Sequence, residues 1–217
     1  MQERVFIWVA HPGKGSFNAA LADAYEKGAL ASGAEVRRMD LSEMAFSSDF
    51  HGYADAPELE PDLLRWQQNL KWADRVFVVH PLWWGAMPAL AKTVFDRGLT
   101  PGFAYKYRKG PGIKWDKLLA GKTGDAIITA DTPTWIDTWL YNKPSRRVLK
   151  TQIYDFCGIK PRKVAHLGSV KLSDEAKRQK WMDQAFALGA KPAPISRQES
   201  DAQFGSSGLA GSAASVA

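Results

Sequence analysis

Three short segments of this 217-residue chain carry residue types that could hold a phosphate group and a flat aromatic ligand. The first, residues 11–18, offers glycine amides and the hydrogen-bond donors Ser16 and Asn18. His11 and Lys14 can add positive charge there. A loop of this kind before a helix favours an anion, because first-turn amides point outward and the helix dipole is positive at that end. Its spacing matches neither a P-loop nor a Gly-x-Gly-x-x-Gly fingerprint, which disfavours nucleotide hydrolysis and a standard dinucleotide fold. A plain turn between strand and helix is the alternative interpretation.

The second segment, residues 81–85, places Trp83 and Trp84 next to each other after Leu82. A single tryptophan most often lies in a core, but two adjacent ones in a loop are harder to bury together. Backbone amides and flat rings in such a loop could hold a planar heterocycle.

The third segment begins with Thr129, Ala130, Asp131 and Thr132, directly after another apolar run. Its backbone amides could stabilise negative charge that develops on a bound ring. An ionised Asp131 pointing inward would oppose that charge. We therefore expect the backbone of Asp131, rather than its carboxylate, to face the ligand.

Each segment must be positioned by a strand. Apolar or alternating runs predict strands at residues 5–10, 35–41, 75–80, 126–130 and 163–167, with helices at 17–31, 62–73, 87–97, 139–156 and 173–188. This alternation predicts a doubly wound parallel α/β sheet of five strands. The flavodoxin-like order 2-1-3-4-5 buries the apolar first, third and fourth strands and leaves the alternating second strand at an edge. The three segments then meet beyond the carboxyl ends of the strands, where such sheets bind ligands.

The composition sets limits on function. The 29 basic and 23 acidic side chains give a formal charge of +6, spread along the sequence rather than gathered in a nucleic-acid-binding patch. The single cysteine, Cys157, cannot form an internal disulfide, and no apolar run is long enough to span a bilayer. We expect a cytoplasmic protein without nucleic acid, membrane insertion or metal, whose positive charge suits a phosphate-bearing cofactor.

The chain is expected to form one domain over residues 1–190, followed by a Pro-, Ser-, Gly- and Ala-rich tail over residues 191–217. Residues 42–61 carry three aromatic rings without a regular pattern, and residues 98–115 form a surface excursion. Loops of this length are usually functional or packed against a partner.

In these segments the sequence resembles the flavodoxin-like NAD(P)H:quinone oxidoreductases, the family of DT-diaphorase, bacterial quinone reductases and potassium-efflux ancillary subunits. The resemblance covers residues 4–190 and rests on several motifs in combination. They are Ala10-His11-Pro12 with Ser16-Phe17-Asn18, residues 80–89, Lys92 with Phe95-Asp96-Arg97, Gly102-Phe103-Ala104-Tyr105, and Phe156-Cys157-Gly158.

The resemblance implies a flavin, FMN or FAD, with NADH or NADPH as electron donor. The residues implied on the phosphate side are His11, Ser16, Phe17 and Asn18, and those implied at the isoalloxazine ring are Pro81, Leu82, Trp83, Trp84 and Gly85. Tyr105, and with less support Tyr107, would line a substrate pocket that is often built across a homodimer interface. The implied reaction is two-electron hydride reduction of quinones or similar acceptors by a ping-pong mechanism.

The third segment departs from the family pattern. Many members carry Thr-Thr-Gly-Gly there, and DT-diaphorase has a downstream tyrosine and histidine that help proton transfer. This chain instead continues through Trp135, Ile136 and Asp137, and the next histidine, His166, is predicted to be structural because it lies within a strand. The variant loop looks like one found in a bacterial subgroup, so flavin contact by residues 129–132 remains expected, while the proton source stays open.

Three other functions stay open. A flavodoxin-like electron carrier is disfavoured by the basic charge, because flavodoxins are typically acidic. An ancillary regulatory subunit of a potassium-efflux transporter would need that transporter as a partner. Azoreductase or nitroreductase activity would use the same site chemistry.

Overall fold

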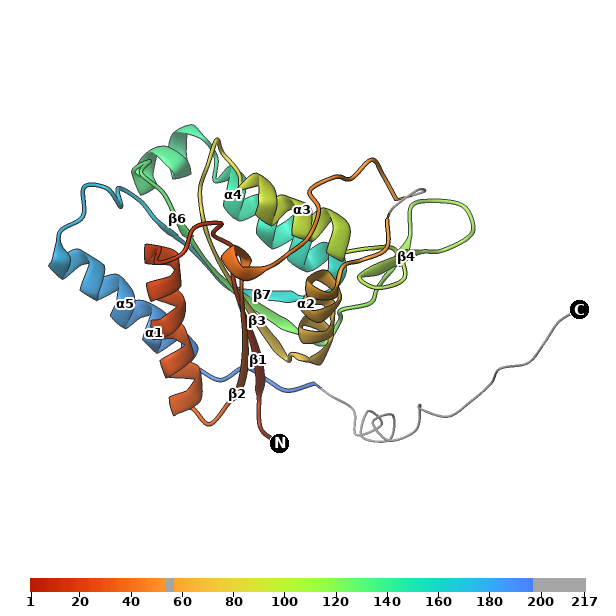
Figure 1. Ribbon diagram of the computed structural model, residues 1–217, viewed down its shortest axis with the longest axis horizontal. Helices are drawn as coiled ribbons and strands as arrows, with labels where there is room; N and C mark the ends of the chain where they lie inside the picture. Colours follow the sequence, from red (N-terminus) through yellow and green to blue (C-terminus); the bar gives the residue numbers. More distant parts are fainter. Residues whose placement is uncertain (54–56, 197–217) are drawn as a thin grey trace, which may run out of the picture.

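A computed structural model describes residues 1–53 and 57–196 and has one five-stranded parallel sheet at its centre (Figure 1). Its strands, in spatial order, are β2 (Glu35–Asp40), β1 (Arg4–Val9), β3 (Arg75–Pro81), β6 (Thr123–Thr129) and β7 (Lys160–Leu167). Counted along the chain without the short hairpin strands β4 and β5, this is the order 2-1-3-4-5. The predicted fold class is confirmed.

The burial of each strand explains its place in the sheet. Every residue of β3 and β6 is buried, as expected of parallel strands covered on both faces. β2 alternates between exposed and partly buried residues and lies at one edge. The sequence pattern of each strand therefore fixes whether it lies inside or at the rim.

Helices cover both faces of the sheet (Figure 1). On one face lie α1 (Phe17–Ala31) and α5 (Glu175–Gly189), and on the other lie α2 (Pro61–Trp72), α3 (Ala89–Gly98) and α4 (Pro144–Arg147) with the π-helical continuation η3 (Val148–Asp155). Glycines let α1 and α5 approach closely. A Cβ added at Gly28 would lie 2.1 Å from the carbonyl oxygen of Phe186, and one added at Gly189 would lie 2.0 Å from that of Tyr25.

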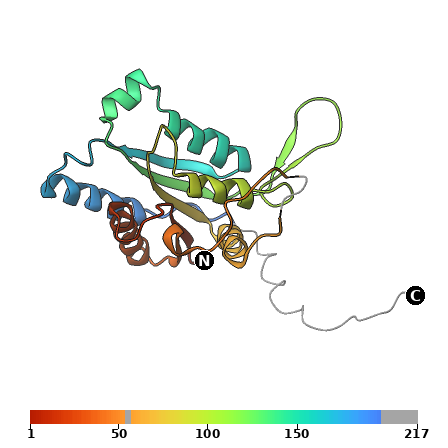
Figure 2. The ribbon, with the colours of Figure 1, turned by 45° about the horizontal axis from the view of Figure 1, so that its top comes forward.

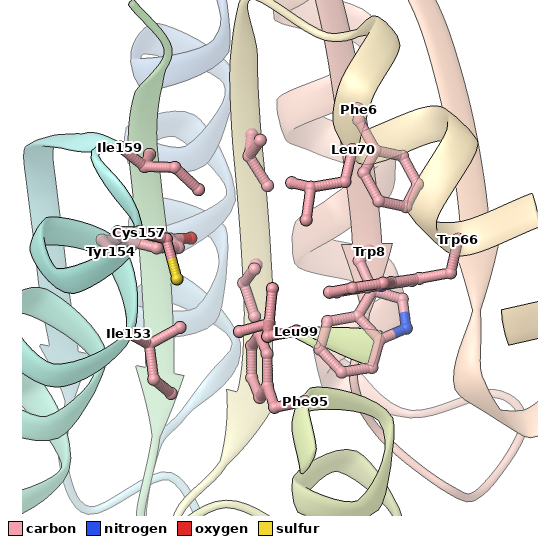
Figure 3. Close-up of a pocket in the computed structure, with 12 residues that line it drawn as sticks. Phe6, Trp8, Trp66, Leu70, Phe95, Leu99, Ile153, Tyr154, Cys157 and Ile159 are labelled. Carbon is pink, nitrogen blue, oxygen red and sulfur yellow. The ribbon is translucent and has the colours of Figure 1, made fainter. Parts of the chain in front are cut away.

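The larger of the two apolar cores lies between the sheet and α2, α3 and η3 (Figure 3). The rings of Trp8 and Trp66 meet edge to face at 5.5 Å, and Phe95 packs in the same way at 5.1 Å from Trp8. The cavity left among these side chains holds only about 10 Å³, so it has room for no ligand larger than a water molecule.

One predicted helix was wrong in detail, and one predicted surface excursion carries a short hairpin. The single helix predicted over residues 139–156 is broken, because Asn142 and Lys143 both have φ of 56° and Pro144 starts a new helix. Before the break lies a separate π-helical turn, η2 (Ile136–Leu140). The excursion over residues 98–115 contributes β4 (Tyr105–Tyr107), which pairs with β5 (Trp115–Lys117) in a hairpin that extends away from the sheet (Figure 2).

The start of the predicted tail packs against the amino-terminal edge of the sheet. The buried guanidinium of Arg75 donates to the carbonyl oxygens of Gly189 and Lys191, and Ala193 N donates to the carboxylate of Glu3 at 3.0 Å. Residues 197–217 lie outside the described part of the chain, so the division into a domain and a tail stays a prediction.

Candidate functional site

Backbone hydrogen bonds beyond the strands bring the three predicted loops together at the carboxyl edge of the sheet. Ala10 N donates to Val79 O at 2.8 Å, Leu82 N to Thr129 O at 2.7 Å, and Ala130 N to Leu167 O at 2.9 Å. Each loop therefore leaves the sheet from a fixed starting point beside its neighbour. This is the place where open α/β sheets bind ligands.

The first loop ends in a well-capped helix. Ser16 is the N-cap of α1, and its Oγ accepts a hydrogen bond from Ala19 N at 3.2 Å. The remaining first-turn amides have no intrahelical partner, so they can receive an anion. The ring of Phe17 packs against that of Trp181 on α5, with 6.0 Å between the ring centroids, so this side chain is engaged within the protein.

Asn18 joins the first loop to the third. Its side chain is buried, and Oδ1 accepts a hydrogen bond from Thr129 Oγ1 at 3.2 Å. One of its polar atoms is thus already used within the protein, and its amide nitrogen is the remaining side-chain donor for a ligand.

The second loop is a tight turn that presents its tryptophans to solvent. Trp83 and Ala86 exchange two backbone hydrogen bonds, and the turn between them has φ of 49° at Trp84 and 80° at Gly85. The glycine suits this left-handed turn. Trp84 is fully exposed, and Trp83 lies edge to face with His11 of the first loop at 5.8 Å.

The third loop is held against the end of β7. Asp131 Oδ1 accepts from Lys171 N at 2.9 Å, so its carboxylate is engaged with the segment that follows β7. Ala130 uses its amide for Leu167 and its carbonyl for Val170. Among the described residues, no hydrogen bond from the amides of Asp131 or Thr132 is found, and these two amides are available for a ligand.

Gly168 allows the third loop to lie this close. A Cβ there would meet Thr134 N at 2.5 Å and the carbonyl oxygen of Thr132 at 2.6 Å.

An apolar cleft of about 440 Å³ opens beside the second loop. Trp83 and Trp84 form one wall, and Lys92, Ser145 and Val148 come from α3 and the α4–η3 segment. The broken helix brings Ser145 to this cleft. Sequence reasoning missed Ser145 and Val148 because it placed both inside one continuous helix.

Tyr105 does not join the three loops within one chain. It lines a neighbouring cleft of about 240 Å³, and its ring packs edge to face on Phe156 at 5.2 Å and on Tyr107 at 5.4 Å. The two clefts share only Lys92 and Val148 among their lining residues.

A buried histidine lies directly before the second loop. His80 is inaccessible to solvent, with Nδ1 2.9 Å from the carbonyl oxygen of Pro81 and Nε2 without a hydrogen-bond partner among the described residues. Burial lowers the pKa of His80 to about 4, so the ring is neutral at neutral pH.

His166 lies within a strand, as predicted, and it also lies close to the third loop. It lies one residue before the carboxyl end of β7, under the third loop, with Nδ1 3.2 Å from Thr134 Oγ1. A polar residue at the carboxyl end of a predicted parallel strand was the signal that could have found it.

No helix of the described residues is long and apolar enough to cross a membrane. No group of three or more His, Cys, Asp or Glu side chains in the same residues is arranged to hold a metal ion.

A sequence profile described as Flavodoxin-like fold matches residues 3–188. The chain belongs to this flavodoxin-like family. The solved structure of an NAD(P)H:quinone oxidoreductase from Methanothermobacter marburgensis superposes with a TM-score of 0.72 at 25% identity, covering 88% of this chain and 96% of that one. The predicted flavodoxin-like family is confirmed, and the predicted resemblance to NAD(P)H:quinone oxidoreductases is confirmed by this structure.

Curated relatives of this flavodoxin-like chain carry related names. An uncharacterized NAD(P)H oxidoreductase of Haemophilus influenzae is 29% identical over 187 residues, 82% of this chain and 90% of that protein. NAD(P)H dehydrogenase (quinone) 1 of Rattus norvegicus is 33% identical over 146 residues, 56% of this chain but only 53% of the rat protein. The Glutathione-regulated potassium-efflux system ancillary protein KefG of an Enterobacter species is 37% identical over 81 residues, 37% of this chain and 40% of that protein.

Proposed function

We propose that this chain is a flavin-dependent NAD(P)H oxidoreductase that reduces quinones or similar flat acceptors by two electrons. The observation that carries the proposal is the convergence of three loops, each with ligand-binding groups, at one edge of a flavodoxin-like sheet. The names of the relatives support the class of reaction.

The residues at this edge fit a flavin. The phosphate would lie at the start of α1, where helix amides, the Ser16 hydroxyl and the Asn18 amide can donate hydrogen bonds. The exposed rings and backbone of residues 81–85 would contact the isoalloxazine ring, and the amides of Asp131 and Thr132 would be available to donate to the negative charge of the reduced ring. The flavin supplies the two-electron transfer between NAD(P)H and the acceptor.

The protein's own part is positioning and electrostatics. The amides of the third loop would stabilise negative charge at the ring, while the bond from Lys171 N to Asp131 holds the opposing carboxylate elsewhere. The apolar cleft beside Trp83 and Trp84 offers flat walls for an aromatic acceptor. Since Tyr105 lies in the neighbouring cleft of its own chain, we propose that it lines this site from a second copy.

Steady-state kinetics test this function. With NADPH or NADH and menadione, we expect parallel double-reciprocal lines, because donor and acceptor use one binding face in turn. Tyr105→Ala should change acceptor selectivity and kcat/KM while flavin content stays intact. Intersecting lines would mean that both substrates bind together, and loss of flavin in the tyrosine variant would place Tyr105 at the cofactor.

A second candidate is an ancillary subunit of a potassium-efflux transporter, which the similarity to KefG favours. This candidate would be favoured over the enzyme if a transporter co-purified with the chain and the flavin-loaded protein did not turn over quinone. Azoreductase activity shares the same site chemistry and is separated only by the acceptor used. The cytoplasmic location also stays a prediction.

A further inference from the structure

The third loop continues to residue 143, and over residues 130–143 it has an exposed outer side and a charged inner side. Trp135, Trp139 and Leu140 are 66%, 84% and 70% exposed, yet Asp137 in their midst is 1% exposed. A buried carboxylate is unfavourable unless other groups pair with it. The partners of Asp137 therefore decide how the loop is held.

Arg146 at the end of α4 is the first partner. Its Nη2 donates to Asp137 Oδ2 and also to Thr138 Oγ1 at 2.8 Å. The backbone adds a bond from Lys143 N to Asp137 O at 2.8 Å. Arg146 thereby ties the middle of the loop to the helix that follows it.

His166 faces the other carboxylate oxygen. Its side chain is 1% exposed, and Nε2 lies 4.0 Å from Asp137 Oδ1. Burial lowers the pKa of His166, Asp137 on η2 raises it and Arg146 on α4 lowers it again, so the ring is neutral at neutral pH. A neutral ring that accepts at Nδ1 from the Thr134 hydroxyl carries its proton on Nε2, the nitrogen nearest Asp137.

His166 and Asp137 lie close together but are not hydrogen-bonded. A separation of 4.0 Å is too long for a hydrogen bond, and His166 Nε2 and Arg146 Nε both lack partners among the described residues. Buried donors without acceptors are rare and unfavourable. An inward shift of the loop by about 1 Å would bring Asp137 within hydrogen-bond distance of His166 Nε2. The loop can therefore pack closer to β7 and gain this bond.

We propose that His166 is a positioning residue for the candidate site: with Asp137 and Arg146 it draws the loop of residues 130–143 into the setting that receives the flavin. This inference rests on the proposed function, because it assigns the loop to the flavin. His166 acts through Thr134 and Asp137 and touches no reacting atom. It also gives a function to the one histidine that sequence reasoning assigned to structure alone.

Chymotrypsin digestion of the flavin-free protein tests the loop directly, because Trp135, Trp139, Leu140 and Tyr141 are exposed cleavage sites on it. In His166→Leu we expect cleavage at these sites, identified by mass spectrometry, to rise about tenfold and FMN affinity to fall about tenfold. His166→Gln should restore both to within about twofold, since its amide nitrogen reaches the place of Nε2. His51→Leu, at a histidine whose side chain is 85% exposed, is the matched control and should change neither.

A double-mutant cycle with Asp137→Asn separates a shared network from two independent defects. The double variant should change the cleavage rate by less than the summed effects of His166→Leu and Asp137→Asn alone. If His166→Leu does not fold, the comparison of His166→Gln with His166→Asn tests the proposal instead. The shorter asparagine side chain reaches only the position of Nδ1, so His166→Asn should not keep the wild-type cleavage rate and FMN affinity.

Three results would overturn the proposal: unchanged cleavage in His166→Leu, additive effects, or faster cleavage with unchanged FMN affinity. Wild-type protein that binds neither FMN nor FAD while the cleavage contrast persists would contradict the proposed function and support the anchoring of the loop.

Discussion

Individual residues around the site already form hydrogen bonds within the protein. These bonds determine which donors and acceptors of each residue are left for a ligand. Ser16 already caps α1, Asn18 accepts from Thr129, and the Asp131 carboxylate accepts from Lys171 N. Their free groups, rather than whole side chains, make up the proposed binding surface. Substitutions here act on both the fold and the ligand, and the two effects must be measured separately.

Ser16 and Asn18 give the first such test. Ser16→Ala should lower the free energy of unfolding by about 1 kcal/mol through the lost cap. The double variant with Asn18→Ala should also weaken flavin binding by at least about tenfold, because donors to the phosphate are lost. Thr129→Val, which removes only the donor to Asn18, is the matched control. Equal loss of affinity in this control would assign the effect to the loop junction instead of the phosphate.

His80 makes stability depend on pH. Its pKa is about 4 in the folded protein and about 6.5 when unfolded, so stability is fully present above pH 6.5 and falls as the pH drops towards 4. A gap of this size corresponds to roughly 3 kcal/mol. Urea unfolding between pH 4.5 and 7.5 should show a shallower slope for His80→Gln than for wild type, with His51→Gln as the exposed control. Parallel curves for wild type and His80→Gln would contradict a neutral buried ring.

The secondary elements are held together by close contacts that sequence patterns do not show. α1 and α5 touch through Gly28 and Gly189, where an added Cβ would lie near 2 Å from a backbone carbonyl oxygen. Helix propensity alone predicts that Gly28→Ala stabilises α1 by about 1 kcal/mol. The close contact with the carbonyl oxygen of Phe186 makes the substitution destabilising instead.

We expect Gly28→Ala to lower the free energy of unfolding by at least about 2 kcal/mol, because the helices must separate to admit the methyl group. Lys27→Ala, one residue earlier and exposed, should stay within about 0.5 kcal/mol of wild type. Thermal or urea unfolding measures both. A stabilised Gly28→Ala would show that α1 and α5 pack more loosely than the structure indicates.

Sequence reasoning succeeded where one residue pattern dominates an element. The apolar runs that became β1, β3 and β6, and the alternating run that became β2, predicted the strand order and hence the meeting of three loops. It failed at residues 139–156, because the left-handed backbone of Asn142 and Lys143 depends on what surrounds it. The approach of His166 to Asp137 was missed for a similar reason, since residues 29 positions apart meet only after the loop folds over β7.

At the scale of the whole molecule, several large aromatic side chains among the described residues are exposed near the candidate site. Trp84, Trp139 and Tyr141 are 103%, 84% and 56% exposed, and they come from the second and third loops of the candidate site. Together with the separation of Tyr105 from its own three loops, this supports a homodimer.

Light scattering at micromolar concentration should therefore give twice the 24.0 kDa chain mass. Tyr105→Ala should leave that mass unchanged. A clean monomer that still turns over quinone would rule out a site shared between two copies.

We propose above all that the carboxyl edge of this sheet holds a flavin. The most direct measurement is the absorption spectrum of the purified chain, before and after titration with FMN and FAD, followed by heat release and chromatography of what is bound. We expect a yellow protein with one flavin per chain, identified by its elution as FMN or FAD. A chain that binds neither flavin at high micromolar concentration would contradict this proposal.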